Sequence, residues 1–87
     1  MSVYVDEALI GFGRMQMSHM VADTREELDH FADLLGVPRK WIQKAGTPKE
    51  HYDICKAKRA KALRMGAIPV DGRDLVAIFR SKAERAA

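Results

Sequence analysis

Two histidines and three aspartates are the residues of this chain whose chemistry best suits a divalent cation. They are Asp6, His19, Asp23, His51 and Asp53. Imidazole nitrogens and carboxylate oxygens are common ligands of hydrolytic metal ions, although none of the strong spacings such as HExxH is present. His51 and Asp53 share a face if their segment is a strand, because residues i and i+2 point the same way. With Asp6, these two are the candidate catalytic residues of a metal-dependent phosphoesterase or nuclease, and divalent metal is a cofactor only under this hypothesis.

A second group of residues has the chemistry to bind phosphate. Nine Lys or Arg fall between Arg39 and Arg64, against only Glu50 and Asp53. Trp41 lies among them and can stack on a base while the cations hold phosphates. The leading hypothesis is therefore a site for a phosphate-bearing ligand, a nucleotide or a nucleic-acid segment, with no cofactor. The residues predicted to form it are Arg14, Arg39, Lys40, Trp41, Gln43, Lys44, His51, Tyr52, Asp53, Lys58 and Arg59.

Each of these residues also has a structural interpretation. Trp41 can pack on the core as a lid, and the basic run can be a solvated helix face. His19 can be a hydrogen-bonded core histidine. Arg59 lies among apolar positions of its expected helix, where a charge requires a partner such as Asp53 or Asp6, or a phosphate.

Composition narrows the class of protein. The 87 residues include 15 Lys or Arg and 12 Asp or Glu, and the charge is unevenly distributed. Residues 1–36 hold two basic and seven acidic residues, a net charge of −5, whereas residues 37–87 hold thirteen basic and five acidic residues, a net charge of +8. The single Cys55 excludes a disulfide scaffold within the chain. Without a long apolar run or a secretory start, the sequence predicts a soluble, cytoplasmic protein that does not bind membranes.

The elements that must position these residues are predicted from periodicity. The chain is expected to be one domain over residues 1–87, in which 80–87 form a polar C-terminal helix end or tail. A capping box beginning at Thr24 and a stop at Gly36 predict a helix over 25–35. The other elements are expected at 3–5, 15–22, 51–54 and 68–70 for strands, and at 55–65 and from about 71 for helices. The last helix is expected to point Leu75, Val76, Phe79 and Ala83 inward, while 37–50 form a loop.

This order, β-β-α-β-α-β-α, predicts an α/β fold of about four mostly parallel strands with three helices. Ligands of such sheets bind beyond the carboxyl ends of the strands. An aspartate falls at each of those predicted ends: Asp6, Asp23, Asp53 and Asp71. Asp23 and Asp71 are also expected helix N-caps, which leaves Asp6 and Asp53 as the stronger candidates for a site.

The chain resembles a family of short bacteriophage and bacterial proteins, domain of unknown function 4031. The resemblance spans Val3 to about Arg73. It is carried by Val3 to Asp6, Gly13 to Met15, His19-Met20, Ala22 to Thr24, Glu27-Leu28, Trp41, Gln43, His51 to Ile54, Lys58-Arg59 and Gly66-Ala67. The resemblance implies a small stand-alone domain, which we expect to be phage-encoded, and it transfers no activity. A third hypothesis is therefore an inhibitor or adaptor that binds a host protein.

Overall fold

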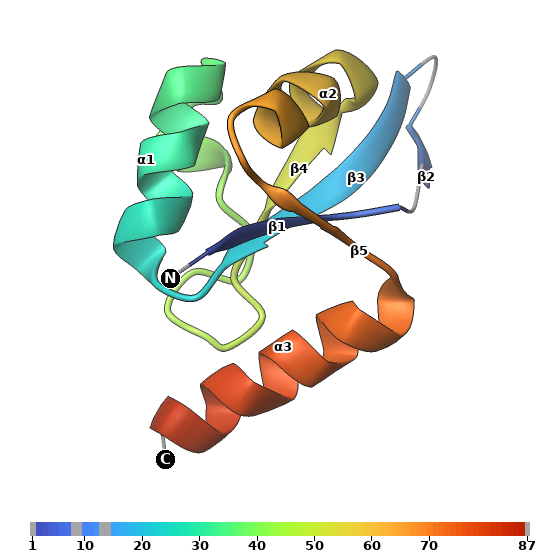
Figure 1. Cartoon of the computed structure of the whole chain (residues 1–87). Helices are drawn as coiled ribbons and strands as arrows, with labels where there is room; N and C mark the ends of the chain where they lie inside the picture. The colour runs from blue at the N-terminus through green and yellow to red at the C-terminus, as the bar shows by residue number, and fades with distance from the viewer. Residues whose placement is uncertain (1, 8–9, 13–14, 87) are drawn as a thin grey trace.

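The computed structural model of the chain describes residues 2–7, 10–12 and 15–86. Figure 1 shows one sheet with helices on both of its sides. The elements are β1 (Val3–Asp6), β2 (Ile10–Phe12), β3 (Met15–Ala22), α1 (Arg25–Leu35), the 3₁₀ helix η1 (Arg39–Trp41), β4 (Tyr52–Cys55), α2 (Lys56–Arg64), β5 (Ile68–Val70) and α3 (Gly72–Ala86). The predicted α/β class and the three helices are confirmed, and the short β2 is an additional strand.

The strand pairing differs from the mostly parallel arrangement expected from the sequence. Met20 of β3 pairs with Val5 of β1 and with Tyr52 of β4, so these two strands lie on opposite edges of β3. Both pairings are antiparallel, as is the pairing of β2 with β3. Only β1 and β5 are parallel neighbours. The sheet is therefore mixed, with β3 running against the other four strands.

The cause is the long segment that follows α1. Helix α1 leaves the end of β3 at Ala22, and residues 36–51 bring the chain back to that same end, because Tyr52 begins β4 opposite Met20. A strand that starts where its neighbour ends must be antiparallel to it. The second connection behaves as predicted: α2 links β4 to β5, which run in the same direction.

The signals that predicted α1 are confirmed in its caps. The Thr24 hydroxyl accepts the Glu27 backbone N–H at 3.2 Å, as a capping box requires. At the other end Gly36 adopts a left-handed conformation with φ of 77°, which a side chain would disfavour. The helix therefore begins and ends where the sequence predicts.

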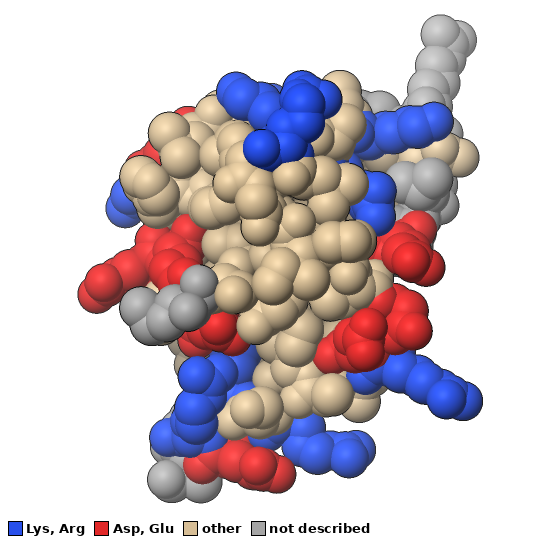
Figure 2. All heavy atoms as spheres, in the orientation of Figure 1, with Lys and Arg blue, Asp and Glu red and all other residues tan. Residues whose placement is uncertain are grey.

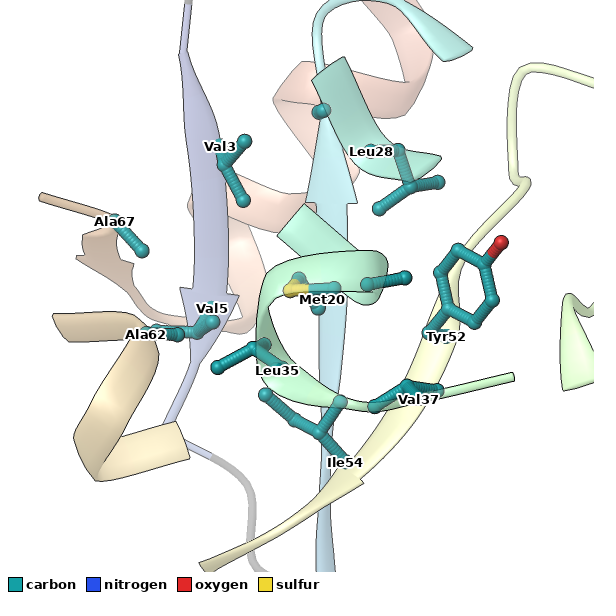
Figure 3. Close-up of a cluster of buried hydrophobic side chains, with 12 residues drawn as sticks. Val3, Val5, Met20, Leu28, Leu35, Val37, Tyr52, Ile54, Ala62 and Ala67 are labelled. Atoms are coloured by element: carbon teal, nitrogen blue, oxygen red, sulfur yellow. The ribbon is translucent and has the colours of Figure 1, made fainter. Parts of the chain in front are cut away.

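The hydrophobic core lies between the sheet and the helices α1 and α2 (Figure 3). Val5, Met20, Tyr52 and Ile54 line this face of the three neighbouring strands and are at most 1% exposed. Because side chains alternate along a strand, the residues next to these point to the opposite face of the sheet. That opposite face, on the side of α3 in Figure 1, therefore carries Asp6, His19 and Asp53, which are the neighbours of Val5, Met20 and Ile54 along their strands.

Helix α3 does not pack its apolar side chains into the core as predicted. Val76 is 55% exposed and Ala83 is exposed, whereas Leu75 and Phe79 are half-buried. The face of the sheet that is turned toward α3 carries polar side chains such as His19. It therefore offers no continuous apolar surface on which the apolar side chains of α3 could pack. The helix therefore borders a cavity. Within the described residues, no helix is both long and apolar enough to cross a membrane.

Candidate functional site

Three of the predicted metal-binding residues converge on the polar face of the sheet. His19 of β3 is the direct cross-strand partner of Asp53 in β4, and His51 lies two residues before Asp53. The Nε2 atoms of His19 and His51 lie 3.8 Å and 3.4 Å from the same Asp53 oxygen. Potential ligand atoms of the three side chains all lie within 4.8 Å of one another. The register of β3 against β4 thus assembles two imidazoles and one carboxylate.

The second nitrogen of each ring is already hydrogen-bonded to an acceptor. Nδ1 of His19 lies 2.6 Å from a carboxylate oxygen of Asp6, and Nδ1 of His51 lies 2.8 Å from the carbonyl oxygen of Lys49. A carbonyl and a carboxylate can only accept, so each Nδ1 must carry the proton. In the neutral imidazoles both Nε2 lone pairs therefore face Asp53.

This arrangement calls for a cation among the three side chains. Two lone pairs and a carboxylate oxygen repel one another unless a proton or a metal ion lies between them. Hydrogen-bonding one ring nitrogen to an acceptor while the other binds metal is the usual way in which proteins orient ligating histidines. Two histidines and one carboxylate are a common ligand set of catalytic metals, because three protein ligands leave positions open for water and substrate.

Asp6 orients His19 and is not itself one of the three clustered side chains. It is 3% exposed, and its two oxygens accept from the His19 ring and, at 2.9 Å, from the His19 backbone N–H. Both contacts hold His19 in position. Asp23, the remaining predicted ligand, accepts hydrogen bonds from the Ser2 backbone N–H and the Tyr4 hydroxyl and contributes nothing to this cluster. Asp23 does not cap α1 either, since Thr24 does.

A cavity of about 810 Å³ opens beside the cluster, between the sheet, the loop before β4 and α3. Its walls are mostly apolar on the side of α3, and three basic residues lie on its border. The lining residues are His19, Lys44, Thr47, Pro48, Lys49, His51, Leu75, Val76, Phe79, Arg80 and Ala83. Of the predicted phosphate-binding residues that the structure describes, only Lys44 and His51 line this cavity, and Asp53 follows His51 two positions later.

Several of the predicted phosphate-binding cations are engaged elsewhere. Arg39 forms a two-pronged ion pair with Asp33, at 3.0 and 2.7 Å. Lys58 donates to the Leu35 carbonyl at the end of α1. Arg59 donates to the backbone carbonyl of Asp6 at 2.8 Å, so its partner is the residue expected from the sequence but not its carboxylate. Figure 2 shows basic side chains gathered over α2 and again along α3, on different parts of the surface.

The other predicted ligand residues are also dispersed. Tyr52 is buried, and its hydroxyl donates to Asp29 at 2.6 Å. Burial, and then this hydrogen bond, raise the pKa of Tyr52 to about 12. Trp41 is 56% exposed, so it is neither a lid on the core nor part of the cavity lining. Lys40 is exposed, the Gln43 backbone pairs with that of His51, and Arg14 lies outside the described residues.

A buried lysine near the cavity was not anticipated from the sequence. Lys82 of α3 is 9% exposed, and its Nζ has no hydrogen-bond partner among the described residues. Its ion-pair partner is Glu50, at 4.0 Å, and Glu50 also contacts Arg25. Burial lowers the pKa of Lys82, and the Glu50 carboxylate partly opposes this shift. Lys82 lies seven residues after Leu75 on α3 but lines a neighbouring pocket with Arg25 and Glu50, not the cavity itself. This helical spacing was the available signal.

Replacing the buried ammonium with an apolar side chain of similar length should not weaken the fold. We expect Lys82→Met to raise the free energy of unfolding by about 1 kcal/mol at neutral pH, because a charge without a hydrogen bond no longer has to be desolvated. Urea titration of both proteins measures the difference. The pKa of Lys82 is lower in the folded state than in the unfolded state. The free energy of unfolding of the parent protein therefore rises as the pH rises between these two pKa values. Over that pH range the stability advantage of the Met variant shrinks. A loss of more than ~1 kcal/mol would mean that the Lys82–Glu50 contact stabilises the fold.

Comparison with known proteins identifies the family of the chain but no activity. No curated protein and no solved structure matches the chain. One family model does match, over residues 3–82, which is nearly the whole chain and includes every residue of the cluster described above. The family is described as a protein of unknown function, DUF4031. The chain belongs to this family, as its sequence motifs indicate.

Proposed function

We propose that this protein is a metal-dependent hydrolase of phosphate esters, in which His19, His51 and Asp53 hold a divalent cation. The observation that carries the proposal is the orientation of the two imidazoles. Each Nδ1 is hydrogen-bonded to an acceptor and each Nε2 faces the Asp53 carboxylate. Unless a metal ion or a further proton lies between them, this geometry brings two lone pairs and a carboxylate oxygen together.

The ligand set suits hydrolysis. With two nitrogens and one oxygen from the protein, a divalent cation retains positions for a water molecule and for an oxygen of the substrate. A cation held by these residues would supply a water nucleophile near neutral pH and would polarise the group under attack. Asp53 is 43% exposed on its side chain and the site adjoins the large cavity, so a substrate can reach the cation from solvent.

The basic residues bordering the cavity favour phosphate as the group that is attacked. Lys44, Lys49 and Arg80 line the cavity with His19 and His51. None of these three cationic side chains has a hydrogen-bond or ion-pair partner among the described residues. Free cations beside a metal site complement the charge of a phosphate ester and stabilise the charge that develops during its cleavage. We place this activity in the reducing cytoplasm, consistent with the unpaired Cys55.

A second candidate function is binding of a phosphate-bearing ligand, such as a nucleotide or a nucleic-acid segment, without catalysis. The same three free cations support it, because they can hold phosphate without a metal. The two functions predict different responses. Metal-independent binding should weaken as salt is added and should not respond to a chelator, whereas hydrolysis should stop when the metal is removed.

The deciding experiment combines metal titration with an assay of hydrolysis. Calorimetric titration with Zn²⁺ and Mn²⁺ should show one site per chain, and the loaded protein should hydrolyse bis(p-nitrophenyl) phosphate until EDTA is added. Asp53→Asn should abolish the hydrolysis and weaken metal binding. The matched control is Asp71→Asn, because Asp71 caps α3 by accepting the Asp74 backbone N–H and asparagine caps equally well. Absence of metal binding in the parent protein would refute the proposal, and phosphate-ester binding that survives EDTA would favour the second candidate.

A further inference from the structure

The chemistry of the cavity indicates which phosphate esters the proposed hydrolase accepts. We infer that its substrate carries a flat apolar ring, aromatic or heteroaromatic, that packs against α3 while the phosphate lies at His19 and His51. This inference rests on the proposed function and concerns the part of the substrate that does not react. Its basis is the apolar wall of the cavity, which the metal site itself does not require.

The wall is formed by one face of α3. Leu75, Val76, Phe79 and Ala83 follow one another at helical spacing and all line the cavity. Val76 is 55% exposed, and the Leu75 and Phe79 side chains are covered only in part. Exposed apolar side chains that gather inside a cavity are typical of a ligand-binding surface, whereas single ones scattered over a surface are not.

The opposite border of the cavity is polar. His19 and His51 lie on the sheet side and Lys44 and Lys49 on the loop before β4, whereas Arg80 lies on α3 itself, next to the apolar wall. Lys44 adopts a left-handed backbone conformation with φ of 53°, which is uncommon for a residue with a side chain. The Thr47 hydroxyl secures this turn by donating to the Lys44 carbonyl at 2.7 Å. A cavity with a cationic border and an apolar wall matches a ligand that has an anionic end and an apolar end.

A ring fits this wall better than a polar group does. The lining of the cavity offers one neutral hydroxyl, that of Thr47, and it is already used to hold the Lys44 turn. On the α3 wall, Arg80 is the one described polar side chain among the lining residues, so few groups there can read the edge of a base or a sugar. Phe79 supplies an aromatic surface, and aromatic pairs add attraction beyond the burial of apolar area. Recognition through the face of a ring is thus the mode that these residues support.

The test compares two phosphonates that cannot be hydrolysed. Phenylphosphonate and methylphosphonate present the same anion to the Zn²⁺-loaded protein and differ only in the apolar group. We expect calorimetry to give about 10-fold or more tighter binding of phenylphosphonate, the scale set by burial of a ring's additional apolar area. Phe79→Ala should reduce that preference by roughly 10-fold without changing the affinity for Zn²⁺ or methylphosphonate.

Two further variants make the result interpretable if Phe79→Ala disturbs α3. Val76→Ser changes an exposed side chain of the same wall, so it should fold normally and also reduce the preference for phenylphosphonate. Leu34→Ala is the matched control, because Leu34 is 48% exposed on α1 and does not line the cavity. Equal affinity for the two phosphonates, or a preference that survives both cavity variants, overturns the inference while Zn²⁺ binding and hydrolysis still stand. Failure of the proposed function is seen separately, as absence of Zn²⁺ binding or of metal-dependent hydrolysis.

Discussion

His51→Ala is expected to reduce the affinity of the protein for Zn²⁺ by at least ~100-fold. Loss of only a hydrogen-bond partner of a ligand costs about 10–100-fold, and His51 is itself one of three proposed ligands. In a saturating excess of metal, about 100 times the dissociation constant, the parent protein should gain about 2.7 kcal/mol in unfolding free energy. For a domain of this size the gain corresponds to an increase of roughly 10–20 °C in melting temperature. The variant at the same metal concentration should show almost none of this increase.

His30→Ala provides the matched control for this result. His30 lies on α1, is exposed and is not part of the cluster. The His30→Ala substitution also removes one imidazole, but from outside the cluster. It therefore measures any weak binding of Zn²⁺ to surface histidines, and the difference between the two variants gives the contribution of the cluster. Thermal melts with and without Zn²⁺, repeated after dialysis against EDTA, give the comparison. If His51→Ala retains the metal-dependent increase and His30→Ala loses it, the metal is bound elsewhere.

The residue types of the site could be predicted from the sequence, but their geometry could not. His51 and Asp53 are two positions apart, with Tyr52 between them, so a strand prediction already places them on one face. His19 is more than thirty positions away, and its proximity depends on the antiparallel register of β3 against β4. The sequence favoured parallel strands, because strand–helix–strand order normally means a crossover. Only the return of the chain after α1 produces the observed register.

The basic residues show why a charge pattern is a weak guide to a site. Helix α1 has no basic residue in its last turn to interact with its terminal carbonyl groups. Lys58 and Lys61 of α2 supply that function by donating to the carbonyls of Leu35 and Leu34. Lys58, a predicted phosphate ligand, and Lys61 of the same basic run therefore stabilise a helix end. The excess of charge was real, but its position relative to α1 could not be inferred from spacing.

Helix α3 illustrates a related difference between a pattern and an environment. Its apolar spacing predicts a buried face, and spacing alone cannot distinguish a helix face that packs on a core from one that borders a cavity. Which of the two occurs depends on the surface that faces the helix. Here α3 faces His19 of the sheet and the loop before β4. Arg80, which lines the cavity, and the buried Lys82 were the signs in the sequence that this part of α3 is not uniformly apolar.

Asp6→Asn is expected to weaken Zn²⁺ binding by about 10–100-fold, although Asp6 does not contact the proposed metal position. It should also lower the free energy of unfolding in the absence of metal by about 1–3 kcal/mol. Asp6 is buried and its carboxylate accepts two hydrogen bonds, from the His19 ring and from the His19 backbone. An asparagine side chain has one oxygen in place of two, so one of these buried donors loses its acceptor. Urea titration and calorimetry measure the two effects separately.

The effect on the metal follows from the position of a single proton. If the asparagine oxygen accepts from the His19 backbone, its amide nitrogen faces Nδ1 of His19 and donates to it. The imidazole proton then moves to Nε2, which can no longer bind a cation because its lone pair is used. Asp71→Asn, on the exposed N-cap of α3, is the control for the same substitution outside the site and should leave both measurements within error. Unchanged Zn²⁺ affinity in Asp6→Asn would mean that His19 does not bind through Nε2, and the assignment of His19, His51 and Asp53 as the ligand set would be wrong.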